Sequence, residues 1–335
     1  MANRQLVVGL VIGIALLHAG GAGAQATLEP PVINPGARSL GLGGAFVAVA
    51  DDATAAYANP SGLVQLVRPE ISVDLRGWSD HRDGTQSNVS GVGFASFVLP
   101  IERWSLAIYG QTIASLEFAE GFWPADTEEI VPLSTLAILN LGVSAAVRVS
   151  ESVSVGVGLL AFGSGVGETG LGLSQTDGQF SWEDSSTDSG VAAGVLWNVS
   201  GAWSLGASYR SGADFRFEND RRASLPDVVA AGARWRSRGG NATVALEIEH
   251  LHGTSDRVRG HAGAEWVFLN SKPLIGLRAG LWHDPADGSG DTADRHDVVH
   301  AAAGIGMAFK HFQLDFGVDA SDRATIASIS AIVTF

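Results

Sequence analysis

The stretch PGARSLGLGGAFVAVADDATAAYANPSGL, residues 35–63, is made almost wholly of Gly, Ala, Ser and Val, with one acidic pair, Asp51 and Asp52. Three glycines within four residues interrupt its first half, so we expect short helices rather than one long helix. Asp52 can cap a following turn. Asn59 is driven out of the α conformation by Pro60, which ends the last helix. Such small side chains suit a compact insert that fits inside a larger structure.

The segment before this stretch has the features of a secretory signal. Arg4 is followed by an apolar run over residues 6–17 and by Ala22-Gly23-Ala24. We therefore expect residues 1–24 to be a signal peptide; the apolar run is too short to span a membrane. Its removal leaves 20 basic and 35 acidic residues, a balance of −15, which argues against nucleic acid as a partner. The absence of cysteine excludes disulfides and zinc–thiolate sites.

From Ile71 onward the sequence alternates between apolar and small or polar residues in segments of about ten. One face of segment 241–250 holds Ala242, Val244, Leu246 and Ile248, and the other holds Thr243, Glu247 and Glu249. After residue 24 no apolar run is long enough for a transmembrane helix. Alternation alone fits either a soluble β-sandwich or a membrane barrel.

The number of segments and the lengths of their connections favour the barrel. The predicted strands are 69–78, 88–99, 103–115, 135–149, 152–164, 189–198, 202–212, 226–237, 241–251, 257–268, 273–283, 297–309, 311–320 and 325–335. Connections after the even-numbered strands are short, whereas most others, such as 116–134, 165–188 and 213–225, are longer. This pattern is typical of outer-membrane barrels whose short turns face the periplasm. The prediction is an all-β fold, a 14-stranded antiparallel transmembrane barrel formed by residues 69–335.

Aromatic residues crowd the strand ends beside the predicted short turns. They are Trp104, Trp197, Trp203, Trp235, Trp266, Phe268, Phe309 and Phe312. Aromatic rings of this kind prefer the lipid headgroup level, so they predict an interfacial girdle. Phe335, which ends the last strand, is predicted to be the signal for insertion into the membrane.

Residues 43–63 resemble the N-terminal plug, or hatch, of the FadL-type outer-membrane transporters of Gram-negative bacteria. The residues that carry this resemblance are Gly43, Gly44, Phe46, Asp51, Asp52, Asn59 and Pro60. It implies that residues 25–68 form a helical plug inside the barrel. It also implies that the protein lies in the outer membrane, where it contacts lipids and lipopolysaccharide after insertion by the barrel-assembly machinery.

The function that the resemblance implies is passive transport of hydrophobic molecules, such as long-chain fatty acids or related hydrocarbons. The alternative is a barrel of the same shape that does not transport and serves in docking or as a secretion accessory. A general porin is a third reading. No spaced nucleophile motif is visible, so we do not expect an enzyme.

Most residues predicted to face the lumen are polar. They are Arg148, Glu247, Glu249, Arg257, Arg259, Glu265, Arg278, His300, Asp315 and Asp319. We expect these side chains to pair with one another and with the plug. A water-filled constriction is the alternative.

One patch near the outer mouth is apolar instead. It comprises Leu136, Ile138, Leu160 and Phe162, with Phe118, Phe122 and Trp123 from the loop above. Either it captures an apolar ligand or it packs to seal the top of the barrel. Nearby, glycines interrupt strands 88–99 and 103–115 and can mark a break in the ladder, in the region where members of the resembling family open sideways.

Four histidines gather near the predicted outer rim: His250, His252, His283 and His296. The loop 284–297 has acidic residues at spacings like those of a calcium site, but without the closing Glu of an EF-hand. We predict a solvated loop, with neither metal nor cofactor.

Overall fold

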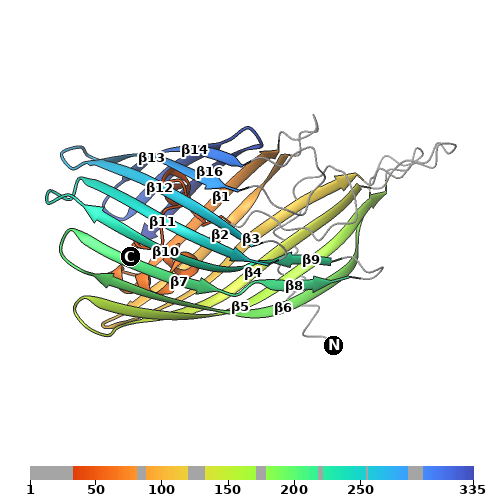
Figure 1. The fold of residues 1–335 in the computed structure, drawn as a ribbon, viewed down its shortest axis with the longest axis horizontal. Helices are drawn as coiled ribbons and strands as arrows, with labels where there is room; N and C mark the ends of the chain where they lie inside the picture. Colours follow the sequence, from red (N-terminus) through yellow and green to blue (C-terminus); the bar gives the residue numbers. More distant parts are fainter. Residues whose placement is uncertain are drawn as a thin grey trace.

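A computed structural model of the chain describes residues 33–80, 88–119, 133–170, 179–217, 222–253, 256–285 and 297–335. Fourteen strands close into one antiparallel barrel in which β16 returns to pair with β1 (Figure 1). This confirms the predicted fold class. The predicted signal peptide, residues 1–24, lies outside the described residues.

The barrel strands are β1 (Glu70–Asp80), β2 (Asn88–Ile101), β3 (Trp104–Ala119), β4 (Leu133–Arg148), β5 (Val153–Gly170), β6 (Gln179–Asn198), β7 (Trp203–Arg210), β10 (Asp227–Arg236), β11 (Ala242–His252), β12 (Arg257–Phe268), β13 (Leu274–Asp284), β14 (Val298–Ala308), β15 (Phe312–Ala320) and β16 (Ala324–Thr334). Each predicted strand segment coincides with one of them, and the boundaries differ by a few residues at most ends. Short turns gather at one end, where the chain also ends (Figure 1).

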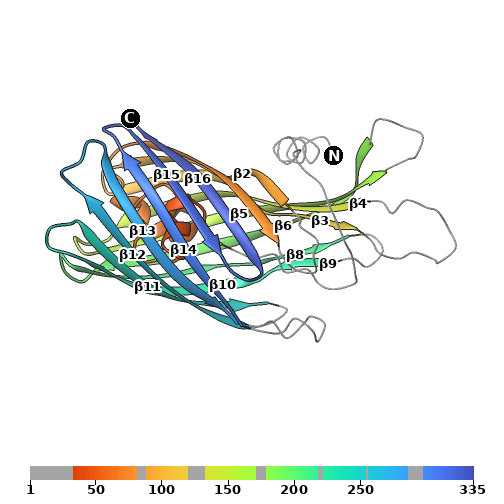
Figure 2. The same ribbon diagram turned by 90° about the horizontal axis from the view of Figure 1, so that it is seen from above.

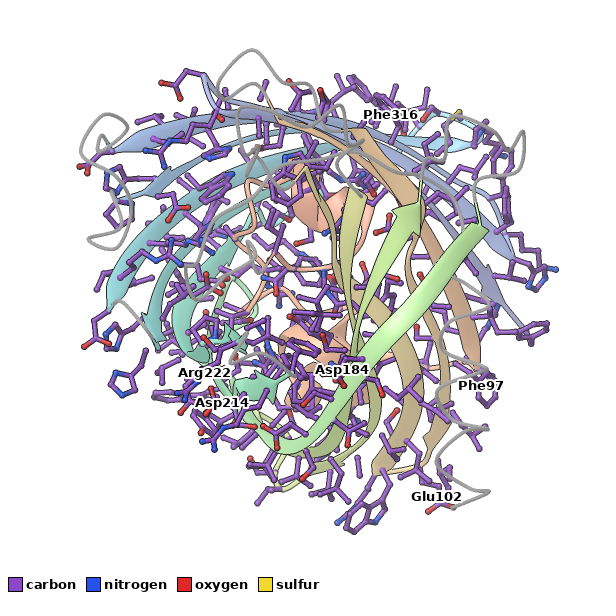
Figure 3. All side chains as sticks on the ribbon, turned by 90° about the vertical axis from the view of Figure 1, so that its right-hand side faces the viewer. Phe97, Glu102, Asp184, Asp214, Arg222 and Phe316 are labelled. Carbon is purple, nitrogen blue, oxygen red and sulfur yellow. The ribbon has the colours of Figure 1, made fainter. Side chains whose placement is uncertain are left out.

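The two faces of each strand divide as the alternation predicts. In β11, Leu246 and Ile248 are exposed, while Glu247 and Glu249 between them are buried. The aromatic side chains Phe97 and Phe316 point away from the barrel (Figure 3). An apolar outer surface around a polar interior is the pattern of membrane barrels, and it rules out a sandwich with a dry apolar core.

The predicted aromatic girdle lies where expected, at the strand ends beside the short turns. All its members except Trp235, which is half-buried, are exposed on the outside of the barrel: Trp104, Trp197, Trp203, Trp266, Phe268, Phe309 and Phe312.

Two predicted loops were wrong. Much of 165–188 continues as strand, so that β5 and β6 pair as far as Gly170 and Gln179. The predicted loop 213–225 contains a separate hairpin, β8 (Ala213–Arg216) and β9 (Arg222–Leu225). Backbone hydrogen bonds between strands form whether or not the outer face of a strand is apolar. Where strands extend beyond the apolar outer surface of the barrel, their sequence therefore no longer alternates, and the alternation cannot be used to predict them.

The ladder between β2 and β3 is incomplete. These strands pair only from Phe94 opposite Gln111 down to the turn, whereas in the described chain residues 88–92 pair only with β1 and residues 114–119 only with β4. Gly93 is an extra residue in the β1–β2 register, and Ile113 is one in the β3–β4 register. The irregularity that the glycine pattern predicts is therefore present as two bulges beside an unpaired edge.

The chain before β1 runs inside the barrel (Figures 1 and 2). We call residues 33–69 the inner segment; it contains α2 (Ala37–Gly41), α3 (Ala55–Ala58) and the 3₁₀-helix η1 (Pro60–Gln65). The predicted short helices are thus confirmed. Asn59 is extended and ends α3, and its side chain accepts from Ser61 at the start of η1. Among the described residues, no helix is long and apolar enough to cross a membrane.

Candidate functional site

Arg38 of α2 is the central charge of the inner segment. Its guanidinium lies 2.5 Å from an Asp51 oxygen and holds Glu265 of β12 through two hydrogen bonds of 3.0 Å. Burial alone would lower the pKa of Arg38, but Asp51, Glu265 and Asp52 together hold that pKa above its ordinary value. The network therefore joins two parts of the inner segment to the barrel wall.

The two residues of the acidic pair, Asp51 and Asp52, make different contacts. Asp52 accepts hydrogen bonds from the backbone N–H and the hydroxyl of Thr54, at 2.9 and 2.5 Å, and so caps the turn before α3 as predicted. Burial raises the pKa of the Asp52 carboxyl, against the lowering effect of Arg38. Asp51 faces the wall and lies 3.3 Å from Arg236 and 3.7 Å from Arg234 of β10.

The middle of the inner segment is held through its backbone. Glu247 of β11 accepts from the N–H groups of Phe46 and Val47, both at 2.7 Å. Asn59 donates to the Val47 carbonyl at 2.8 Å and to the Val195 carbonyl of β6 at 3.3 Å. The side chains of Glu247 and Asn59 thus serve backbone groups that the short helices leave unpaired.

Sequence reasoning missed how closely the wall approaches the inner segment. A Cβ added to Gly280 of β13 would lie 2.2 Å from the Gly43 nitrogen, and one added to Gly206 of β7 would lie 2.4 Å from the Val47 carbonyl. Gly43 and Gly44 themselves have φ of 62° and 83°, which glycine adopts at no steric cost. Glycine at inward positions of otherwise alternating strands was the signal that could have revealed this contact.

On the side of the lumen formed by β11–β15, polar side chains pair with one another as predicted. Arg278 contacts Glu265 at 2.7 Å and Asp315 at 2.5 Å, and Asp319 accepts from Trp282 and contacts His300, both at 2.7 Å. The pairs Arg259–Asp284, at 2.8 Å, and Arg259–Glu249, at 3.7 Å, extend the network. Arg257 lies 4.0 Å from Asp284, and Arg148, exposed at the short-turn end, donates to the Val64 carbonyl at 2.7 Å. We call this side the polar half.

Apolar side chains from β2–β6, β10 and β11 gather in another part of the lumen, among buried polar residues such as Ser144, Ser204 and Arg234. Ile138, Leu160 and Phe162 are buried and inward-facing, as predicted. One continuous cluster joins them to the β8–β9 hairpin and to the inner segment; it includes Phe94, Phe215, Leu225, Val228, Leu251, Tyr57 and Leu63. We call this cluster the apolar column.

The remaining members of the predicted ligand path are not placed. The backbones of Leu136 and Phe118 belong to β4 and β3, but their side chains are not among those described, and Phe122 and Trp123 lie outside the described residues. The hairpin β8–β9 packs on the same cluster as Leu160 and Phe162. Its Phe215 and Leu225 face inward, whereas Asp214 and Arg222 are exposed at the outer end (Figure 3).

Two other features lie away from the lumen. A hollow of about 680 Å³ is lined by outward residues such as Leu205, Leu246 and Leu281, so it faces the surroundings of the barrel. His252 contacts Asp256 at 2.6 Å and His283 contacts Asp297 at 3.1 Å. In the described part of the chain, no three potential ligands gather around a metal position; His296 lies outside it.

Replacement of Arg38 by Met is expected to loosen the inner segment. It removes the counter-charge that Asp51, Asp52 and Glu265 share, and breaking such a network costs about 3–5 kcal/mol. The denaturant midpoint of the refolded barrel should fall, and limited proteolysis should cut within residues 33–69. Arg103→Met, at an exposed turn, is the matched control and should change neither. An unaltered proteolysis pattern in Arg38→Met would show that Arg38 does not hold the segment.

No protein-family model matches the sequence, and a search among curated proteins finds no match. Solved structures do resemble it. A FadL homologue of Pseudomonas aeruginosa superposes with a TM-score of 0.71 at 12% identity, over 92% of this chain and 100% of its own. The monoaromatic hydrocarbon channel CymD gives a TM-score of 0.68 at 16% identity, over 90% of this chain and 97% of its own.

The toluene transporter TbuX of Ralstonia pickettii gives a TM-score of 0.68 at 14% identity, over 91% of this chain and 99% of its own. The likeness extends over nearly the whole of each chain. The fold is therefore that of the FadL-type barrels, and CymD and TbuX are a channel and a transporter rather than enzymes.

Proposed function

We propose that this protein is a passive outer-membrane transporter of hydrophobic molecules, with the inner segment, within residues 25–68, as its plug. The observation that carries this proposal is the apolar column, which reaches from Phe215 and Phe162 near the outer end to Tyr57 and Leu63 of the inner segment. A continuous apolar cluster within a lumen that is otherwise largely polar provides a path along which an apolar molecule stays out of water. Such burial is favourable by about 25 cal/mol per Å².

The proposed transport function leaves two substrate classes to be tested. The resemblance of residues 43–63 points to long-chain fatty acids or related hydrocarbons. CymD and TbuX share the fold and carry monoaromatic hydrocarbons and toluene, which adds small aromatic molecules to the proposal.

The incomplete ladder between β2 and β3 supports a sideways exit. Above the pair Phe94–Gln111 these strands are not paired in the described chain, so no ladder holds them together there. Phe94 and Ile113 both pack in or against the apolar column beside this edge. We propose that substrates leave the column through this gap into the membrane, so that they need not cross the whole plug.

The remaining assignments are also proposals. We propose that residues 1–24 are a signal peptide, that Phe335 signals insertion, and that the short turns, beside the exposed aromatic girdle, face the periplasm of a Gram-negative bacterium. The barrel then contacts outer-membrane lipids and lipopolysaccharide, and the barrel-assembly machinery inserts it.

Uptake by cells tests the function directly. The protein is expressed in a Gram-negative strain that lacks its own hydrophobic transporters, and initial uptake of labelled toluene, oleate and a small polar sugar is compared with an empty vector. Toluene or oleate uptake should rise several-fold, while sugar uptake stays constant. A rise for the sugar would favour a general porin. No rise for any solute, with the barrel abundant in the outer membrane, would favour the docking role.

A further inference from the structure

Four side chains bring polar atoms into the apolar column at one level. Tyr109 and Gln111 belong to β3, Asn140 to β4 and Tyr57 to α3. Gln111 lies directly opposite Asn140 in the ladder, and the Tyr109 ring crosses toward β4 over Gly142. We call these four residues the tyrosine–amide cluster.

Five polar atoms of this cluster lack a hydrogen bond of normal geometry. The two tyrosine hydroxyls, the Gln111 carbonyl and both polar atoms of Asn140 are buried and make no hydrogen bond of normal geometry. The Tyr57 hydroxyl nevertheless lies near Gln111, and the Tyr109 hydroxyl lies near Asn140. The side chains themselves are at most 5% exposed, and Asn140 is fully buried.

Single unpaired polar atoms also occur elsewhere along the wall, for example at Ser72, Ser105 and Ser164. In the polar half, Trp282, Arg278 and Asp319 all have close partners. An unpaired buried donor or acceptor costs about 1–3 kcal/mol. Several such groups at one level of an apolar column are therefore an arrangement that a bound molecule can stabilise by completing their hydrogen bonds.

The surroundings define the rest of such a molecule. The Tyr109 ring stacks on Phe94, with centroids 5.7 Å apart, and meets Tyr57 edge-on at 6.1 Å. Arg210 of β7 covers the Tyr57 ring at 3.9 Å. These rings, with Leu160 and Phe162 in the same cluster, offer apolar and aromatic surface to a flat or elongated apolar body.

The unpaired polar atoms of the cluster determine which functional group a bound molecule must carry. The amide carbonyls of Gln111 and Asn140 accept no well-aligned hydrogen bond from the nearby tyrosine hydroxyls and so have room for a donor, while the Asn140 N–H₂ needs an acceptor. A hydroxyl group does both, whereas a hydrocarbon does neither. A carboxylate only accepts, so it would leave the two carbonyls unpaired and facing a like partial charge.

We propose that the tyrosine–amide cluster is a binding site for neutral hydroxyl-bearing apolar molecules, such as phenols and fatty alcohols. The inference rests on the proposed transport function and narrows its substrate class. Such a molecule places its hydroxyl between Gln111 and Asn140 and its apolar body along the rings of the column. A hydrocarbon that follows the same column passes this level without those hydrogen bonds.

The test compares aromatic ligands that carry a hydroxyl group, no polar group or a carboxylate on the same bromophenyl ring. Crystals of the barrel are soaked with 4-bromophenol, bromobenzene or 4-bromobenzoate, and anomalous scattering locates the bromine. Affinities are measured by saturation-transfer NMR in nanodiscs, with empty nanodiscs subtracted. We expect 4-bromophenol in the column, its oxygen in hydrogen-bond reach of Asn140 or Gln111, and an affinity about tenfold above that of bromobenzene, because one well-paired group accounts for such a ratio.

Two variants remove the polar groups without removing the apolar surface. Asn140→Leu and Tyr109→Phe should each lower the preference for 4-bromophenol over bromobenzene, and the double variant should bring it near one. Ser144→Ala is the matched control: this buried serine lies on the same face of β4, but its hydroxyl already donates to the Ala56 carbonyl at 2.9 Å. It should retain the full preference. Heat-modifiable migration confirms that each variant is folded.

The outcomes separate this inference from the proposed function. Equal binding of 4-bromophenol and bromobenzene, tighter binding of 4-bromobenzoate, or ordered waters that saturate the cluster and persist in the soaked crystal would each overturn the inference alone. If the cells described above take up no apolar compound and no aromatic probe binds, both the transport function and the inference fail.

Discussion

Deletion of residues 36–62 is expected to turn a nearly closed barrel into an open pore. Fourteen strands enclose a lumen too wide for wall side chains alone to fill, and the inner segment occupies that space. The ladder from β1 to β16 closes without it, so the barrel should still form. Single-channel conductance in planar bilayers should rise several-fold over that of the full-length protein.

This experiment must distinguish a barrel that has misfolded from a folded barrel whose pore is no longer blocked. Heat-modifiable migration on gels shows whether the shortened barrel has formed. Arg38→Met serves as an independent variant, because it keeps every residue of the segment but releases its ionic anchor; it should give brief openings above a closed baseline. If the folded deletion variant conducts like the full-length protein, the segment does not block the pore in a membrane, and the plug assignment is wrong.

Replacement of both Ile138 and Phe162 by Asp is expected to reduce uptake of apolar substrates about tenfold or more, since it puts two carboxylates in the apolar column and desolvating a carboxylate costs several kcal/mol. Both side chains are buried and face the lumen, so the outer surface of the barrel is unchanged. Initial uptake of labelled toluene and oleate is measured at equal abundance of the barrel. Uptake of a small polar solute should not change.

A matched control adds a carboxylate elsewhere in the lumen. Ser204 of β7 is also buried and inward-facing, but it accepts a hydrogen bond from Arg234 at 2.8 Å, so Ser204→Asp gives the new charge a partner. Its uptake should match that of the unaltered protein. If the double variant also transports normally, Ile138 and Phe162 only pack beneath the β8–β9 hairpin, and the docking role gains support.

Most of the barrel could be predicted because its signal is local. In β11, Leu246, Glu247, Ile248 and Glu249 alternate in the sequence as they alternate between outside and lumen. A strand that separates lipid from lumen must carry this pattern, and short turns must separate successive strands. Likewise, Asn59 before Pro60 ends α3 through the geometry of one peptide unit.

The errors arose where that local constraint ends. The outer parts of β5 and β6, and the hairpin of Phe215 and Leu225, lie beyond the apolar belt, and backbone pairing sustains them without a regular apolar face. The bulges at Gly93 and Ile113 could be predicted from the glycines of these strands. The loss of pairing between β2 and β3 could not, because it also depends on how β2 pairs with β1 and β3 pairs with β4.

By itself the sequence determined the barrel, its strand number, the facing of its side chains and the short helices of residues 35–63, because each depends on residues a few positions apart. Only the tertiary structure decided which charges meet and which polar groups lack partners. Arg38 lies 227 residues from Glu265, and Tyr57 approaches Tyr109 and Gln111 from another part of the chain. Hydrogen bonds and ion pairs require separations near 3 Å, and alternation along a strand assigns a face but no distance across the lumen.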